Sequence, residues 1–413
     1  MAARVRIGGA VTSSNALASL TPRVVAGFLG TWVLALMAAN LVPVLITSLV
    51  SELGLTIGQA GTVATAMSLG SVLAMLGTAR FIDRWDRPAT ARCGLLLIFA
   101  GFGAGAAVLH PTVVIAGIVA GGVGSGIVVA AGNAAAASTA DPDRTSTVVL
   151  VANRFAAAAL LAIAPLFQGD LRMLLAMIAA VGLVGVVTAG GLPNLPAGFA
   201  GAASATRRNA TAGVVLAATM GTWSMTEEMV YSMTGALAKA AHLSPGAGGL
   251  LLSASVVGGF FGAMASPLLL RLFGRAWSLA AVVAVSTLAK VLMITVASAA
   301  VHGAALIAWG FLYGTVLTLV TGLAARMDVS GRIAVLVSTV YLFGLALGPF
   351  AGGNLIEVVS PAGYAAAVTL PSLAFGTALF VIARRNRALD RPAAAGAPSG
   401  SPGAERPAPP QPR

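Results

Sequence analysis

The amino-acid sequence predicts an all-α integral membrane protein that crosses a lipid bilayer twelve times. Of its 413 residues, 58% are hydrophobic and 9% are charged, whereas soluble globular chains carry about 25% charged residues. Long uncharged stretches include Phe28–Val50, Val113–Ala137 and Gly303–Ala325. About twenty apolar residues span the hydrocarbon core of a bilayer. Because a backbone in lipid must satisfy its own hydrogen bonds, these stretches are predicted to be helices.

Twelve spans follow when the apolar runs are set against the charges that interrupt them. They are predicted near residues 24–50, 57–79, 93–109, 113–137, 146–167, 173–192, 213–237, 248–270, 277–299, 303–325, 333–359 and 364–382. Residues 1–22 lack a continuous apolar run, so we expect a cytoplasmic tail and no cleaved signal peptide. Residues 384–413 are rich in Pro, Ala, Gly and Arg and are predicted to form a disordered cytoplasmic tail.

The arginines indicate how the chain is oriented in the membrane. If the N-terminus is cytoplasmic, the connections on that side carry eleven arginines, namely Arg80, Arg84, Arg87, Arg92, Arg144, Arg207, Arg208, Arg271, Arg275, Arg326 and Arg332. The opposite connections carry only Arg172 and Lys239. Cytoplasmic loops are enriched in Lys and Arg, so both termini are predicted to be cytoplasmic in a cell membrane. The formal net charge of +12 is therefore a topology signal, and no nucleic-acid partner is expected.

The chain divides into two similar halves. A polar, flexible linker at 193–212 separates an N-terminal unit, 23–192, from a C-terminal unit, 213–383. The tripeptide Gly30-Thr31-Trp32 recurs as Gly221-Thr222-Trp223, and Leu55-Thr56-Ile57-Gly58 is echoed by Leu243-Ser244-Pro245-Gly246. The offsets of 191 and 188 residues agree closely, which favours an internal duplication of six spans.

The loop after the second predicted span carries a recognisable motif. The segment Ala79-Arg80-Phe81-Ile82-Asp83-Arg84-Trp85-Asp86-Arg87 resembles the G-x-x-x-D-R-x-G-R loop of the major facilitator superfamily. Asp83, Arg84 and Arg87 match, while Ala79 and Asp86 replace glycines. The resemblance implies a charged latch in which Asp83 faces a helix N-terminus in the outward-open state. The alternative is an ordinary positive-inside loop.

A second motif lies in the eleventh predicted span. Gly344, Gly348, Pro349, Gly352 and Gly353 form the pattern G-x-x-x-G-P-x-x-G-G, which is similar to the pattern that antiporters of this superfamily carry in the fifth span. Small residues four apart let helices approach closely. Helix packing is therefore the alternative to an antiport function for these residues.

The resemblance to this superfamily implies two six-helix bundles around a central cavity, which is lined by the first, fourth, seventh and tenth helices. Transferred onto this sequence, the lining candidates for substrate binding are Asn40, Asn133, Glu228, Tyr231, Trp309 and Tyr313. Trp309 and Tyr313 are four residues apart and share a helix face. No charged residue occurs from 111 to 140, so the fourth span lacks the arginine that proton-coupled exporters often place there.

Charges inside the predicted spans are the other candidates, because an ionisable group in lipid is costly and usually functional. Arg154 is either a structural partner or a substrate anchor, and Lys290 either snorkels or forms a structural pair. Glu227 and Glu228 are both candidates for proton coupling. Neighbours on a helix point about 100° apart, so one cavity cannot receive both, and Glu228 is expected to face it. Burial there favours its neutral form.

These features predict a secondary transporter, and proton-linked efflux of an amphipathic or lipophilic drug or metabolite is the first hypothesis. Proton-linked uptake of a small organic anion anchored by Arg154 is the alternative, and a channel or a non-transporting receptor is the rival from another class. The sequence contains no nucleotide-binding loop and no cysteine or histidine cluster, so no cofactor, metal or enzymatic activity is expected. The expected partners are the substrate, protons and membrane lipid, with the protein as a monomer.

Overall fold

The computed structural model describes residues 17–163, 170–195, 207–327 and 332–385. These residues are almost entirely helical, and one isolated bridge joins Ala18 to Thr139. The predicted tails at 1–16 and 386–413 and the middle of the linker, 196–206, lie outside the described residues. The all-α prediction is confirmed.

The first half begins with a broken helix. Its pieces are α1 (Pro22–Phe28), the π-helical η1 (Leu29–Val33), α2 (Met37–Asn40) and α3 (Val42–Leu53). The chain leaves the helix at Leu41, with φ −97° and ψ 7°, two residues before Pro43, which has no N–H for the helix. The rest of this half is α4 (Ile57–Ala79), η2 (Ile82–Arg84), α5 (Arg87–Ala107), α6 (Pro111–Ala136), α7 (Pro142–Ile163), α8 (Leu171–Thr188) and η4 (Ala189–Gly191).

The second half repeats this plan. It consists of α9 (Arg207–Ser232), α10 (Thr234–Ala240), α11 (Pro245–Thr295), α12 (Ala299–Met327), α13 (Arg332–Val358) and α14 (Pro361–Arg385). The seventh crossing, like the first, is interrupted, here at Met233 between α9 and α10. Several helix ends differ by a few residues from the predicted spans, as at α5, which begins at Arg87 where residue 93 was expected.

Twelve crossings follow from these helices. Nine helices in the described ranges are long and apolar enough to span a membrane. One of them, α11, has 51 residues and would be about 77 Å long at 1.5 Å per residue, more than twice the hydrocarbon thickness. It reverses at Gly274, whose φ of 69° and ψ of 165° are not helical, so it supplies two crossings. The broken helices α1–α3 and α9–α10 supply the other two.

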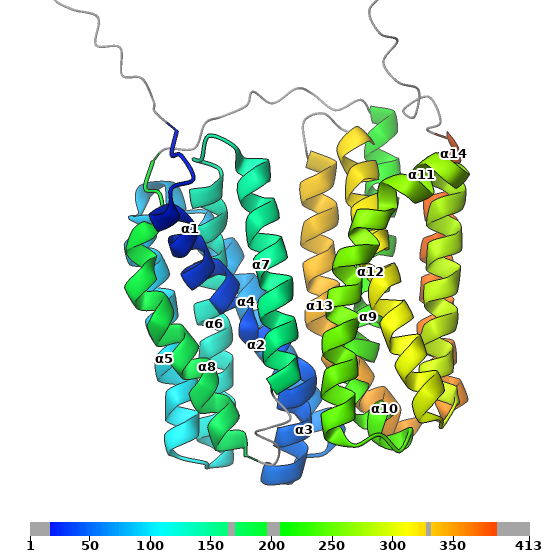
Figure 1. Ribbon diagram of the computed structural model, residues 1–413, viewed down its shortest axis with the longest axis horizontal. Coiled ribbons are helices and arrows are strands. Elements are labelled where there is room, and N and C mark those ends of the chain that lie inside the picture. Colours follow the sequence, from blue (N-terminus) through cyan, green and yellow to red (C-terminus); the bar gives the residue numbers. More distant parts are fainter. Residues whose placement is uncertain (1–16, 164–169, 196–206, 328–331, 386–413) are drawn as a thin grey trace, which may run out of the picture.

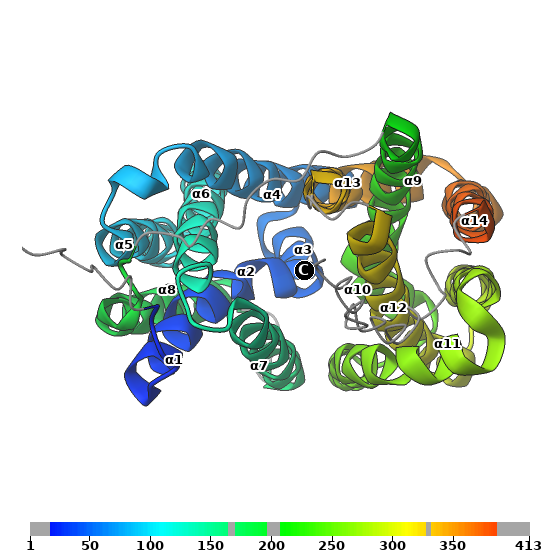
Figure 2. The same cartoon turned by 90° about the horizontal axis from the view of Figure 1, so that it is seen from above.

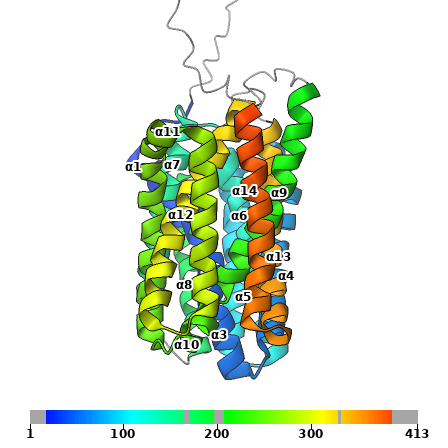
Figure 3. The ribbon, with the colours of Figure 1, turned by 90° about the vertical axis from the view of Figure 1, so that its right-hand side faces the viewer.

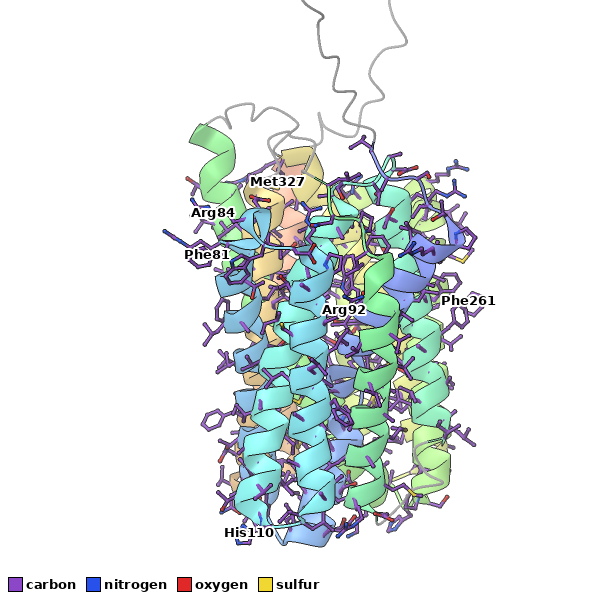
Figure 4. The ribbon with its side chains drawn as sticks, turned by 90° about the vertical axis from the view of Figure 1, so that its left-hand side faces the viewer. Phe81, Arg84, Arg92, His110, Phe261 and Met327 are labelled. Carbon is purple, nitrogen blue, oxygen red and sulfur yellow. The ribbon has the colours of Figure 1, made fainter. Side chains whose placement is uncertain are left out.

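The helices form two bundles that stand side by side, α1 to α8 in one and α9 to α14 in the other (Figures 1 and 2). The start of α1 and the end of α14 lie at the same end of the molecule (Figures 1 and 3). We call this end the terminal face and the opposite end the distal face. Arg84 and Arg92 lie toward the terminal face, whereas His110 lies at the distal face (Figure 4).

Large apolar side chains cover the outside of both bundles. Val335, Leu370 and Phe261 are exposed by 67%, 69% and 54%, and Phe261 projects from the surface (Figure 4). A soluble protein rarely exposes so many large apolar groups together. This surface is suited to lipid.

The two bundles meet along two main seams in the distal half of the molecule, with smaller contacts of α3 against α9 and α10. In the first seam α4 packs against α13, and the Phe350 N–H donates to Thr65 Oγ1 at 2.9 Å. In the second seam α7 packs against α11, and Ser253 Oγ donates to the Ala158 carbonyl at 2.7 Å. These contacts close the distal side of the interface.

Candidate functional site

A cavity of about 450 Å³ lies between the bundles at mid-depth. It receives residues from α2, α3, α4 and α7 of the first half and from α9, α11, α12 and α13 of the second. Most of its surface is apolar, and the aliphatic residues that line it include Leu36, Val72, Leu150, Val256 and Leu345. Its polar lining consists of Asn40, Ser68, Ser71, Asn153, Arg154, Glu227, Glu228, Tyr231, Ser255, Trp309, Tyr313 and Tyr341.

A hydrogen bond between the bundles borders the cavity. The Tyr231 hydroxyl donates to the carbonyl of Asn40 at 2.6 Å, and the amide of Asn40 donates to Asn153 Oδ1 at 3.0 Å. The helix break after Asn40 explains why this carbonyl is available to the other bundle. Asn40, which the sequence placed in the cavity, thus lies there and binds through its backbone as well as its side chain.

Aromatic rings form one wall of the cavity. The ring centroids of Tyr231 and Trp309 are 6.3 Å apart, and those of Trp309 and Tyr313 are 6.0 Å apart. The hydroxyls of Tyr313 and Tyr341 are hydrogen-bonded to each other. The guanidinium carbon of Arg154 lies 6.0 Å from the Tyr313 ring centroid, within range of a cation–π interaction. These rings offer a broad surface to an apolar or aromatic solute.

The two charged groups of the cavity that remain available are Arg154 and Glu228. Both line it and both are partly exposed. Within the described residues, neither the Glu228 carboxylate nor the Arg154 guanidinium forms a hydrogen bond or an ion pair, and the guanidinium lies over the Tyr313 ring. The site therefore presents one carboxylate and one cationic guanidinium to a solute.

Glu227 lies in a different environment. Its side chain is 1% exposed and forms an ion pair with Lys290, which is fully buried. The indole N–H of Trp309 donates to its second carboxylate oxygen, and Lys290 Nζ also donates to Ser372 Oγ at 2.9 Å. Four helices of the second bundle, α9, α11, α12 and α14, meet in this network.

The expectation that only one glutamate could reach the cavity is wrong, because Glu227 and Glu228 both border it. On α9, Glu227 and Glu228 point about 100° apart. Tyr231 lies four residues after Glu227, which is one full turn plus about 40°, so its side chain points between the two glutamates. The cavity follows this whole arc of α9. The two carboxylates differ in their partners and in their exposure, since Glu227 is 1% exposed and Glu228 is partly exposed.

Asn133 does not belong to the cavity. It lies in the last turn of α6, which ends at Ala136 near the terminal face, and its side chain is exposed. The cavity lies deeper, at the level of Glu228 and Asn40. The fourth helix meets the second and third helices instead, where Gly122 abuts the Met67 carbonyl and Gly117 that of Gly101.

The loop motif forms bonds within the first bundle. Arg87 is 3% exposed and donates from Nη1 to Ser138 Oγ at 3.0 Å. Asp86, which replaces a glycine of the motif, caps α5 by accepting from the Ala89 N–H at 2.7 Å and accepts from the Asn194 amide at 2.6 Å. Asp83 and Arg84 are exposed at the terminal face. Their role as a latch stays a prediction.

The glycines of α13 lie where other helices come closest. A Cβ on Gly344 would lie 2.1 Å from the Gly221 carbonyl, and one on Gly348 would lie 2.4 Å from Glu228 Cβ. Gly352 abuts Met229, and Gly353 abuts Ile57 across the seam between the bundles. Pro349 sits inside the helix with its carbonyl against Gly61.

Sequence reasoning did not predict five of the polar lining residues, namely Ser68, Ser71, Asn153, Ser255 and Tyr341. Asn153 was noticeable as a polar neighbour of Arg154 inside an apolar span. Tyr341 lies three and seven residues before Gly344 and Gly348, so it shares the packing face of α13. The glycines of that face were interpreted as an antiport motif or as helix packing, and neither interpretation pointed to the cavity that its terminal end borders.

Comparison with known proteins decides the family. Residues 27–349 match the family described as Major Facilitator Superfamily. The chain belongs to this superfamily. It is thus a multi-pass membrane protein of a transporter family. No curated protein sequence matches it.

Three solved structures show the same fold at low sequence identity. One is a bacterial homologue of the human lysosomal transporter Spinster in an inward-facing, unoccupied conformation, with 14% identity, a TM-score of 0.62, and coverage of 89% of this chain and 97% of that chain. Another is the nucleoside transporter NupG, with 16% identity, a TM-score of 0.64, and coverage of 89% and 99%. The third is the human organic anion transporter MFSD10, with 16% identity, a TM-score of 0.60, and coverage of 88% and 100%.

Proposed function

We propose that this member of the superfamily exports a small amphipathic or lipophilic solute across the cell membrane in exchange for protons. The observation that carries the proposal is the surface of the cavity, which is mainly apolar, has a wall of aromatic rings, and presents one carboxylate and one guanidinium without an ion-pair partner among the described residues. A sugar-like solute would need several convergent hydrogen-bonding groups. An apolar ring with a single polar or charged group matches this lining better.

Alternating access supplies the transport step. The two bundles are closed against each other at the distal seams, and transporters of this kind work by rocking one bundle against the other around a site near the midplane. The distal face is then extracellular, and both termini are cytoplasmic. Reporter fusions at Arg208 and at Arg385 test this topology, and two periplasmic signals would contradict it.

Glu228 is the proposed proton carrier. Its carboxylate borders the cavity with no hydrogen-bond or ion-pair partner among the described residues, whereas Glu227 is held by Lys290 and Trp309. A low-dielectric cavity favours the neutral carboxyl group, and a solute that displaces the proton couples the two fluxes. In proteoliposomes, the dependence of ethidium flux on an imposed pH gradient should be lost in Glu228→Gln. A full response to the gradient in that variant would refute the assignment.

Uptake of a small organic anion is the second candidate, and the position of Arg154 favours it. This guanidinium lies on the cavity beside the Tyr313 ring and has no ion-pair partner among the described residues, so it can bind a carboxylate. Arg154→Ala should abolish binding of benzoate if the protein imports anions, and should leave ethidium flux largely intact if it exports lipophiles. Ohmic conductance, measured on the protein in a lipid bilayer, would instead indicate a channel.

A further inference from the structure

The buried ion pair between Glu227 and Lys290 is not explained by a gain in stability. Both side chains are almost completely inaccessible, and removing two charges from water offsets most of what their attraction contributes. Apolar side chains of similar size often pack there equally well. An ionisable group retained inside a membrane span is therefore a candidate for function.

The contacts of Glu227 show what the pair holds. One carboxylate oxygen accepts from Lys290 Nζ, and the other accepts from the indole N–H of Trp309. Trp309 is 4% exposed and belongs to the cavity wall, with Tyr231 and Tyr313 as its ring neighbours. The orientation of this ring is thus fixed by a carboxylate, and the carboxylate is fixed by a lysine on another helix.

We propose that Glu227 and Lys290 are positioning residues that hold the Trp309 ring as the wall of the substrate cavity and so set the affinity for the apolar part of the solute. Lys290 anchors the carboxylate from α11, and Ser372 of α14 holds the ammonium group in turn at 2.9 Å. Because Glu227 is bound to Lys290 and Trp309, it is not the residue that exchanges a proton during transport. This inference builds on the proposed function, because it assigns a specificity role within the same cavity.

Two paired variants separate the hydrogen bond to Trp309 from the ion pair itself. The double variant Glu227→Met, Lys290→Met removes both charges together, so no bare buried charge is left to prevent folding. The double variant Glu227→Gln, Lys290→Met also removes the ion pair but keeps an amide oxygen as acceptor for the indole. Ser286→Ala is the matched control, because this buried hydroxyl lies one turn from Lys290 and has no partner among the described residues.

The first measurement needs no transport. In a chain whose tryptophans other than Trp309 are changed to Phe (Trp32, Trp85, Trp223 and Trp277), acrylamide quenching of fluorescence reports how firmly the ring is held. We expect stronger quenching in the Met/Met variant than in the Gln/Met variant, and unchanged quenching in Ser286→Ala. Equal quenching in both double variants would overturn the proposal, whether or not the protein carries protons.

The second measurement is ethidium transport by the same variants in the otherwise unaltered chain. The KM of the Met/Met variant should exceed that of the Gln/Met variant about five-fold, the equivalent of one ordinary hydrogen bond, with similar maximal rates. Adding Trp309→Phe to the Met/Met variant should raise KM no further, because the lost interaction already acts through that ring. Equal KM values in the two double variants, or a further rise with Trp309→Phe, would contradict the proposal.

Discussion

Glu357 forms a contact between the bundles whose loss should open the distal side. It lies in the last turn of α13, and its Oε1 accepts the Gly58 N–H at 3.0 Å while Oε2 accepts from Thr56 Oγ1 at 3.4 Å. Gly58 is in the first turn of α4, in the other bundle. A carboxylate at this position satisfies a free N–H group and interacts favourably with the positive end of the helix dipole. The contact exists only while the distal side is closed.

The size of the effect follows from the bonds that each substitution removes. Glu357→Gln keeps an oxygen for Gly58 but loses the negative charge, which costs about 1 kcal/mol at a partly exposed helix N-terminus. Glu357→Ala loses both bonds, and hydrogen bonds to charged groups contribute about 1.5 to 3 kcal/mol. A change of about 1 to 2 kcal/mol alters an equilibrium by about 5- to 30-fold. The open population should therefore rise about five-fold in the first variant and about thirty-fold in the second.

Cysteine modification from the distal face measures this population. Cys93 is the only cysteine of the chain, so Cys93→Ser gives a background in which Val42→Cys, on the cavity lining, is the only target. A membrane-impermeant thiol reagent should modify it faster in Glu357→Gln and fastest in Glu357→Ala.

Glu52 provides the matched control for this experiment. Its carboxylate accepts the Leu171 N–H at the start of α8, so it caps a helix by the same chemistry but within one bundle. Glu52→Gln should leave the modification rate unchanged. Unaltered rates in both Glu357 variants, or an equal increase in Glu52→Gln, would refute the assignment of Glu357 as a contact that holds the distal side closed.

The remaining predictions concern packing and the loop motif. Gly344→Ala should lower the free energy of unfolding in detergent by about 1 to 3 kcal/mol, the usual cost of overpacking, because its Cβ would meet the Gly221 carbonyl; Gly77→Ala, which meets nothing within 4 Å, should leave stability unchanged or raised. Equal losses in both variants would show that the close approach does not matter. Asp83→Asn should reduce ethidium flux while the amount of protein in the membrane, measured by immunoblot, stays normal, and full flux would show that the loop is not a latch.

The sequence predicted the helices well because lipid leaves the backbone few choices. A run of about twenty apolar residues must be helical, and arginines mark many of the run ends on one side of the membrane. The exceptions are the broken crossings. Pro43 signals the break at Leu41, but a proline inside a helix does not by itself say where the chain departs, and α13 runs through Pro349 without ending. The exposed carbonyl of Asn40 was therefore beyond sequence reasoning.

The site was predicted less completely, because helix periodicity gives directions around one helix but not depth or partners. Tyr231, Trp309 and Tyr313 were placed by the resemblance to the superfamily and Glu228 also by its direction on the helix, and the structure brings all four to one cavity. Asn133 was also placed on a helix expected to line it, but its depth along α6 keeps it away. The pairing of Glu227 with Lys290 joins positions 63 residues apart, and no local pattern encodes such a contact.

The duplication of the chain explains where the cavity lies and also where its symmetry ends. The offset of 191 residues equates Asn40 with Tyr231, and these two residues are hydrogen-bonded across the bundles. Equivalent positions of two repeats can touch only near the axis that relates them, so this bond lies at the centre of the interface. The same relation equates the second helix with the eighth and the fifth with the eleventh. A seam between the second and eleventh helices therefore requires another between the fifth and eighth, as found at α4–α13 and α7–α11.

The two seams share a geometry but differ in chemistry. The α4–α13 seam contains the Glu357 carboxylate on a helix N-terminus, whereas the α7–α11 seam contains a hydroxyl–carbonyl bond and the rings of Phe155 and Phe260, whose centroids are 5.5 Å apart. An apolar contact resists separation in proportion to its area, whereas a carboxylate on a helix N-terminus adds charge-assisted hydrogen bonds and an attraction to the helix dipole. The two halves therefore share one packing arrangement, while single residues give each seam its own chemistry.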